Sequence, residues 1–116
     1  MSKRVLVTGM SGLIGGLLKE HLNALGGYEL SALNRSVVKD VPTHSADISN
    51  LDEIRPAFEE IDTVVHLAAY LSSDSFEEQL PTNIVGTYNV FEAARLAGVK
   101  RVVYASSGST VRGVEN

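Results

Sequence analysis

The sequence predicts an α/β domain in which a doubly wound parallel sheet is covered by helices. Three observations support this: strand-like apolar runs alternate with helical patterns, the runs are apolar at successive positions, and a glycine-rich turn follows the first run. The chain of 116 residues, 44% hydrophobic and 21% charged, is large enough for one domain with a modest core. No linker or repeat divides it, so residues 1–116 form one predicted unit.

The first part of the chain has the pattern of a strand, a helix and a second strand. Residues 4–8 form the predicted first strand, and residues 13–25 carry leucine and isoleucine at helical spacing. Gly26 and Gly27 are typical of a helix end. Residues 28–33 then complete a βαβ unit.

Three further strands follow. A weak third strand is predicted over residues 41–46 and a fourth over 63–67, separated by a short helix with an apolar face over residues 51–61. Asn50 and Glu53 resemble a capping box at its start, and Pro56 predicts a kink or split inside it.

The longest helical pattern covers about residues 75–97, ends at Gly98, and precedes a fifth strand at 99–105. Right-handed crossovers place the strands in the order 3-2-1-4-5, the opening of a Rossmann-type sheet.

The glycines after the first strand indicate a phosphate site. Gly9, Gly12 and Gly15 are spaced three residues apart, between an apolar strand and a helix. This spacing is typical of dinucleotide-binding turns, in which the pyrophosphate binds the free amides at the helix N-terminus. We therefore predict a dinucleotide cofactor.

Charge and composition narrow the other partners. The net charge of −4 makes nucleic acid an improbable partner, and the absence of cysteine excludes thiolate metal sites and disulfides. His21, His44 and His66 are scattered without a carboxylate cluster, so no metal site is predicted. We find no membrane-spanning run and no signal peptide, and expect a cytoplasmic protein.

Five motifs in order carry a family resemblance from Lys3 to about Gly113. They are Thr8-Gly9-x-x-Gly12-x-x-Gly15, Asp47-Ile48, His66-Leu67-Ala68-Ala69, Asn83-Ile84-x-Gly86-Thr87-x-Asn89-Val90, and Ser106-Ser107. The chain resembles the extended short-chain dehydrogenase/reductase family, which includes nucleotide-sugar epimerases and dehydratases, and its pattern is also similar to uronate-type sugar-acid dehydrogenases.

The resemblance implies a set of cofactor-binding positions. They are Gly9, Ser11, Gly12, Leu13, Ile14, Gly15, Asn34, Arg35, Asp47, Ile48, Leu67, Ala68, Ala69 and Asn83. Asp47 has an alternative role as a cap of the following turn, and Asn83 as a helix cap. We interpret His66 as a hydrogen-bonded structural residue.

The end of the second strand bears on the choice between NADP and NAD. A carboxylate there binds the ribose hydroxyls of NAD, whereas arginine accommodates the 2′-phosphate of NADP. Asn34 and Arg35 stand at this point, which favours NADP. The alternative, with Arg35 as a solvated loop residue, leaves NAD open.

The fifth strand ends where the family places a catalytic hydroxyl. Ser107 is our choice, with Ser109 and Thr110 as alternates, and a turn without chemistry as the other interpretation. Arg112 departs from the tyrosine found in many relatives. The family's proton-transfer pair, Tyr-x-x-x-Lys, is not in this sequence, because Ala32, Asp74, Glu92 and Gly108 stand four residues after the four tyrosines.

We therefore interpret the chain as the N-terminal portion of a longer enzyme acting on a sugar-type substrate by hydride transfer, and expect it to be inactive alone. The alternatives are a non-catalytic NADP-binding sensor and a half-domain without a ligand. The long helix bears apolar residues on more than one side, Ile84, Tyr88 and Phe91 among them, which predicts a homo-oligomer unless the second face packs inside the domain.

Overall fold

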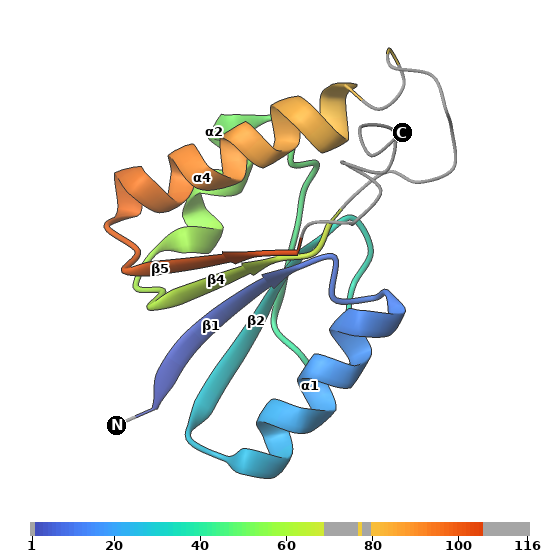
Figure 1. Cartoon of the computed structure of the whole chain (residues 1–116), viewed down its shortest axis with the longest axis vertical. Coiled ribbons are helices and arrows are strands. Elements are labelled where there is room, and N and C mark those ends of the chain that lie inside the picture. The colour runs from blue at the N-terminus through green and yellow to red at the C-terminus, as the bar shows by residue number, and fades with distance from the viewer. Residues whose placement is uncertain (1, 69–76, 78–79, 106–116) are drawn as a thin grey trace, which may run out of the picture.

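A five-stranded parallel sheet forms the centre of the computed structural model, which describes residues 2–68, 77 and 80–105 (Figure 1). The sheet order is β3-β2-β1-β4-β5, as predicted, and every neighbouring pair is parallel. The strands are β1 (Lys3–Thr8), β2 (Tyr28–Asn34), β3 (Thr43–Ser45), β4 (Thr63–His66) and β5 (Arg101–Tyr104). The order brings the carboxyl ends of β1, β2 and β4 together at one edge.

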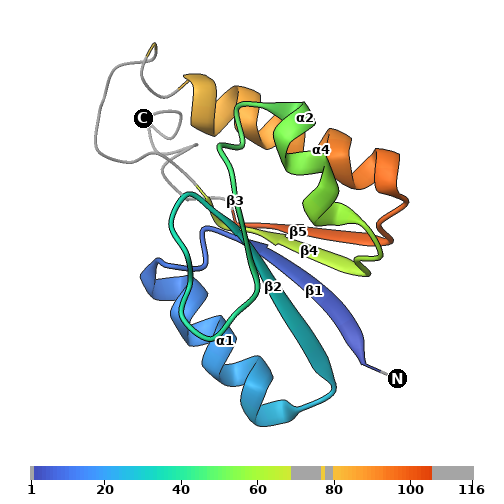
Figure 2. The same cartoon turned by 180° about the vertical axis from the view of Figure 1, so that it is seen from behind.

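Helices cover both faces of the sheet. Helix α1 (Leu13–Leu25) lies on one face, and α2 (Leu51–Ile54) and α4 (Gly86–Ala97) lie together on the other, as Figures 1 and 2 show. The 3-10 helix η1 (Arg55–Phe58) continues α2, and the π-helix η2 (Leu80–Val85) leads into α4. This two-sided cover is the doubly wound arrangement.

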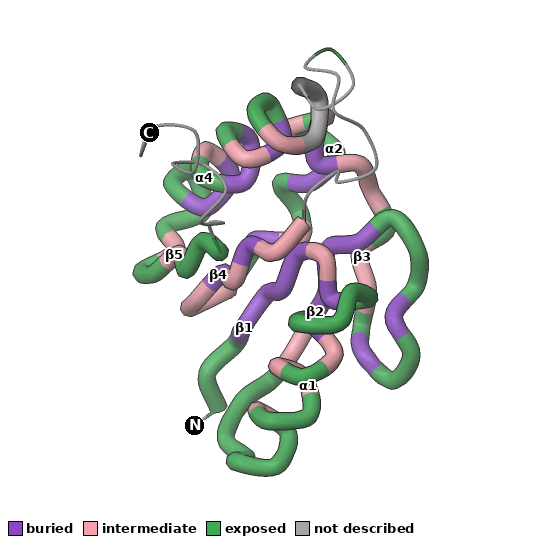
Figure 3. The backbone as a smooth tube through the Cα atoms, turned by 45° about the vertical axis from the view of Figure 1, so that its right-hand side comes forward, coloured by how far each residue is buried: buried purple, intermediate pink, exposed green. Residues whose placement is uncertain are grey.

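Alternate residues of β1 supply two separate cores. Val5 and Val7 pack with Met10 and Ala32 on the α1 side, whereas Leu6 packs with a larger cluster under α2, η1 and α4. Phe58 at the end of η1 is fully buried in that larger cluster, where burying such a side chain stabilises the fold by about 1.5–3 kcal/mol. Figure 3 shows the buried stretches concentrated in the central strands and on the inner side of α4.

The helix after β3 follows its sequence signals closely. Asn50 Oδ1 accepts a hydrogen bond from the Glu53 backbone amide at 3.2 Å, which confirms the cap. The α-helix gives way to the 3-10 helix at Arg55, with Pro56 in its first turn, so the predicted split is also confirmed.

Three strands are shorter than predicted, the fourth by a single residue because β4 ends at His66. The third strand covers three residues instead of 41–46, because Pro42 has no amide to donate and the preceding segment turns through a Val41 amide to Val38 carbonyl bond. The fifth strand covers only Arg101–Tyr104, because these four residues pair with the four residues of its partner β4. The long helix is described from residue 80 and ends at Gly98 as predicted.

Helix α4 has one face in the core and one outside it. Val90, Ala93 and Ala94 are buried, whereas Tyr88 and Phe91 are largely exposed. Edge strand β5 also leaves about half of the Tyr104 side chain uncovered. Within the described ranges, no helix has both the length and the apolar character that crossing a membrane requires.

Candidate dinucleotide site

The glycine segment is a strand-to-helix elbow, as the sequence predicts. Gly9 has a φ of +72°, and its carbonyl accepts a hydrogen bond from the Gly12 amide at 3.2 Å. Gly12 is the N-cap of α1, and the first turn of α1 contains no acidic side chain. The first amides of a helix have no partner inside it, so they form a positive end that favours an anion.

Two of the three glycines are required by the packing of the chain itself. A Cβ atom on Gly9 would lie 2.8 Å from the Ala68 Cα, and one on Gly15 would lie 2.5 Å from the Met10 Cα. The first contact joins the elbow to the end of β4, and the second joins α1 to the end of β1. Both positions therefore exclude any larger residue.

Gly12 is different because the surrounding protein does not require it. Its backbone, with φ −77° and ψ 176°, is open to any residue, and an added Cβ would meet only the Gly9 carbonyl oxygen at 3.6 Å. The space in front of this glycine is an open cradle at the start of α1. A phosphate group fits such a cradle, and a side chain would fill it.

Asn34 connects the elbow to the end of β2. It is 8% exposed, and its Nδ2 donates to Ser11 Oγ at 3.3 Å and to the Ser36 carbonyl at 2.8 Å. The amide thus holds the middle of the glycine turn and the loop after β2 together. Leu13 and Ile14, in the first turn of α1, expose most of their surface beside it.

Arg35 and Asp47 form an exposed ion pair at the ends of β2 and β3. Arg35 Nη2 lies 3.2 Å from Asp47 Oδ2, while Asp47 Oδ1 accepts the Ser49 amide at 2.9 Å. The Ser49 hydrogen bond first, and Arg35 in addition, lower the pKa of the Asp47 carboxyl. The capping role suggested as an alternative for Asp47 is therefore present, and it leaves the carboxylate at the edge where the adenine side of the site is predicted.

Ile48 is held in place by helix α4, which packs on the same face of the sheet. Its carbonyl accepts a hydrogen bond from Asn89 Nδ2 of α4 at 2.9 Å, and both residues are buried. Asn83, predicted as a cofactor residue, lies half-buried in η2. Asn89 belongs to the same motif, yet the sequence alone does not indicate that it anchors the loop after β3.

His66 is fully buried, and both of its ring nitrogens are hydrogen-bonded. Nδ1 lies 2.6 Å from Thr8 Oγ1, and Nε2 lies 3.1 Å from Thr87 Oγ1. Thr8 Oγ1 also accepts the amides of Leu67 and Ala68 at 3.0 and 3.1 Å. Burial lowers the pKa of His66 to about 4, so the ring is neutral at pH 7. The interpretation of His66 as a hydrogen-bonded structural residue agrees with these contacts.

The structure brings most of the predicted positions to one edge of the sheet. The elbow, Asn34 with Arg35, Asp47 with Ile48, and Leu67 with Ala68 follow the carboxyl ends of β1, β2, β3 and β4. This edge includes the point where the chain crosses from one side of β1 to the other, which is where doubly wound sheets bind ligands. Ala69, Ser107, Ser109 and Thr110 lie outside the described residues.

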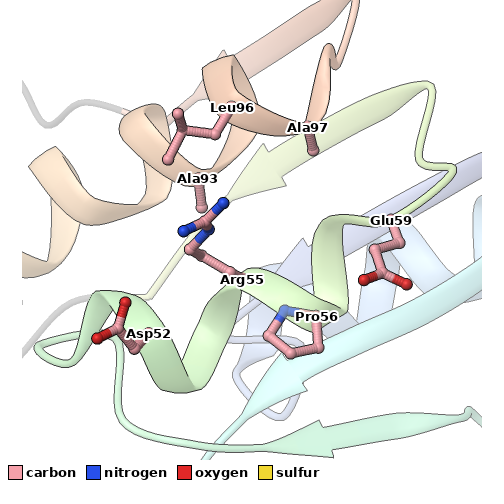
Figure 4. A pocket seen from close by; sticks show the side chains of 7 residues that line it. All are labelled: Asp52, Arg55, Pro56, Glu59, Ala93, Leu96 and Ala97. Carbon is pink, nitrogen blue, oxygen red and sulfur yellow. The ribbon is translucent and has the colours of Figure 1, made fainter.

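A separate open groove of about 440 Å³ lies between η1 and α4 (Figure 4). The charged side chains of Asp52, Arg55 and Glu59 line one side of it, and Ala93, Leu96 and Ala97 of α4 line the other. None of the predicted cofactor residues lines this groove. In the part of the chain that the structure describes, no three histidine or acidic side chains gather as metal ligands would.

The sheet order and the glycine elbow define a domain of the Rossmann type, the architecture that binds dinucleotides at this edge. The chain belongs to the NAD dependent epimerase/dehydratase family, whose model matches residues 5–115.

The relatives include dehydrogenases and epimerases. The chain is 30% identical over 112 residues to a uronate dehydrogenase of Pseudomonas putida KT2440, covering 93% of this chain and 42% of the relative. It is 34% identical over 131 residues to a UDP-glucose 4-epimerase of Mycolicibacterium smegmatis, covering 95% and 40%. The structure of a mutant uronate dehydrogenase from Agrobacterium tumefaciens with NAD superposes with a TM-score of 0.80 at 32% identity, covering 92% and 42%. The chain thus spans about two fifths of the length of these relatives.

Proposed function

We propose that this chain binds a nicotinamide dinucleotide at the glycine elbow and is the cofactor-binding part of an enzyme that oxidises or epimerises a sugar acid or nucleotide sugar. The observation that carries the proposal is the open cradle in front of Gly12 at the start of α1. The relatives support it, because a uronate dehydrogenase with this fold is known with NAD.

The residues at the elbow fit the charge of a pyrophosphate. The amides at the start of α1 supply hydrogen-bond donors, and no carboxylate in the first turn opposes the anion. Asn34 keeps Ser11 in place through its hydrogen bond, so the turn is ordered before the ligand arrives. Preorganisation of this kind lowers the entropic cost of binding.

Asp47 and Ile48 would hold the adenine end. Their loop is fixed by the Ser49 cap on one side and by Asn89 on the other. Arg35 is paired with Asp47 of this loop, and its guanidinium would bind a 2′-phosphate on the adenine ribose. We propose NADP as the preferred cofactor, with the 2′-phosphate competing against Asp47 for the guanidinium.

A bound nicotinamide would supply the hydride acceptor or donor. Ser107, or its alternates Ser109 and Thr110, would hydrogen-bond the substrate oxygen. Since no tyrosine of this sequence has a lysine four residues later, we expect binding without turnover for the 116-residue chain.

A pair of glycine variants tests the proposal. Gly12→Ala places a methyl group in the cradle without a clash in the chain, whereas Gly16→Ala, one turn into α1, meets nothing within 4 Å and is the matched control. In calorimetric titrations with NAD(H) and NADP(H), we expect Gly12→Ala to weaken affinity at least about tenfold, equivalent to about 1.4 kcal/mol, and Gly16→Ala to leave it unchanged. Equal affinities in all three proteins, or no binding by the wild type, would contradict the proposal.

A second titration addresses the cofactor preference. Arg35→Gln removes the charge while keeping a polar, shorter side chain. We expect it to weaken NADP binding at least about tenfold and NAD binding much less, because a charge-assisted pair to the 2′-phosphate is lost only with NADP. An equal effect on both cofactors would count against NADP as the preferred ligand.

A further inference from the structure

Two buried side chains, Thr8 and His66, and the half-buried Thr87 form a continuous hydrogen-bonded path from the elbow to α4. Thr8 precedes Gly9 at the end of β1, His66 ends β4, and Thr87 lies in the first turn of α4. The two links of this path are the 2.6 Å contact between Thr8 Oγ1 and His66 Nδ1 and the 3.1 Å contact between His66 Nε2 and Thr87 Oγ1. We call these three residues the relay.

Counting the donors and acceptors in the relay shows which atom carries each proton. Thr8 Oγ1 already accepts two backbone amides, that of Ala68 and that of Leu67, which also donates to the Thr8 carbonyl at 3.1 Å, so both of its lone pairs are used. Its own proton must then point to His66 Nδ1, which is an acceptor only in the neutral ring. The remaining ring proton is on Nε2 and is donated to Thr87 Oγ1. The geometry therefore requires the Nε2–H tautomer of His66.

The Thr8 hydroxyl also helps to hold the backbone after β4 against the glycine elbow. By accepting the amides of Leu67 and Ala68, Thr8 Oγ1 draws the backbone that follows β4 towards the end of β1. There the space for a Cβ on Gly9 is closed by the Ala68 backbone at 2.8 Å. A change in the direction of the Thr8 hydroxyl would thus alter the backbone on which the glycine turn rests.

We propose that Thr87 is a positioning residue for the dinucleotide site, acting through His66 and Thr8 on the backbone at residues 67–68 and on the glycine elbow. The inference rests on the proposed function, because the affinity that the relay adjusts is that for the dinucleotide. It gives α4 a role in addition to covering the sheet. The position of this helix affects the dinucleotide affinity of the glycine elbow, which follows the neighbouring strand β1.

Among the described residues, side chains from three neighbouring elements contact the His66 ring. Thr8 faces the ring from β1, Thr87 from α4, and Tyr104 from β5, with the Tyr104 and His66 rings stacked at a centroid distance of 5.5 Å. Protonation of His66 itself is the event that would break the relay, since Nδ1 would become a second donor facing the Thr8 hydroxyl.

Variants of Thr87 test the inference. Thr87→Val keeps the shape and removes the acceptor, Thr87→Ser keeps the acceptor, and Thr63→Val at the other end of β4 is the control. We expect Thr87→Val to weaken NAD or NADP binding at least about threefold, and Thr87→Ser to retain wild-type affinity. Nitrogen NMR of His66 without nucleotide should show the Nε2–H tautomer in the wild type and in Thr87→Ser, and a displaced Nε2–H signal in Thr87→Val, where that proton has lost its acceptor.

A titration of the wild type tests the same point should Thr87→Val fail to fold. Coupling between two sites is reciprocal, so a dinucleotide that favours the neutral relay must lower the pKa of His66, by about one unit for a tenfold affinity ratio. The phosphate charge alone would raise that pKa, so a fall is specific to the relay. An unchanged or raised pKa, or wild-type affinity in Thr87→Val, would overturn the relay alone. Failure of the wild type to bind either cofactor would instead overturn the proposed function.

Discussion

Acidification is expected to destabilise this fold through His66. The buried ring has a pKa of about 4 in the folded chain, against about 6.5 in the unfolded chain. Between these values the unfolded state binds more protons, so stability is complete above pH 6.5 and falls as the pH decreases towards 4. The same two pKa values give a loss of about 2 kcal/mol at pH 5, and about 3 kcal/mol once the pH is below both.

Urea unfolding at pH 7.5 and pH 5 measures this loss, with His66→Asn as the comparison because its amide does not titrate. We expect the wild type to lose about 2 kcal/mol between the two pH values and the variant to lose much less, whatever its stability at pH 7.5. The pKa of Asp47 is shifted downwards, so its carboxyl does not contribute in this range. Equal losses in the two proteins would refute the assignment of acid sensitivity to His66.

Three further predictions concern packing. Gly15→Ala places a Cβ 2.5 Å from the Met10 Cα and should destabilise the chain by several kcal/mol. Gly16→Ala has open space around its Cβ and should stabilise the chain by up to about 1 kcal/mol. Thermal unfolding of the two variants measures both changes. Asn89→Ala removes the donor to the Ile48 carbonyl and should lower the free energy of unfolding by about 1–3 kcal/mol. Chemical denaturation measures this loss, and an unchanged free energy of unfolding would contradict the prediction. Phe91→Glu, on the exposed face of α4, should reduce self-association in light scattering, and a monomeric wild type would contradict the predicted oligomer.

Local patterns were sufficient for much of the fold. The apolar run of β1, the glycines after it and the helical spacing of α1 depend on neighbouring residues, and the structure confirms the elbow they predict. The Asn50 cap and the Pro56 split are likewise decided within a few residues. Strand ends were less predictable, because the length of β3 and β5 depends on hydrogen bonds with partners distant in the chain.

In the site, too, some features follow from neighbouring residues and others from partners distant in the chain. Most of the predicted cofactor positions lie at or just after a strand end, and that placement followed from the order of elements. Contacts between motifs did not: Arg35 meets Asp47 across two strand ends, and Asn89 reaches Ile48 from another layer. The tautomer of His66 depends on Thr8, 58 residues away, and on Thr87, 21 residues away.

The sequence by itself determined the class of fold, the sheet order and the position of the glycine turn, since strand and helix periodicities and glycine conformations are local properties of the chain. Only the tertiary structure decided which glycines the packing requires, which carboxylate Arg35 pairs with, and how a buried histidine shares protons with two threonines. Those features arise from distances between side chains on different elements, and such distances exist only when the sheet and its two helical layers are assembled.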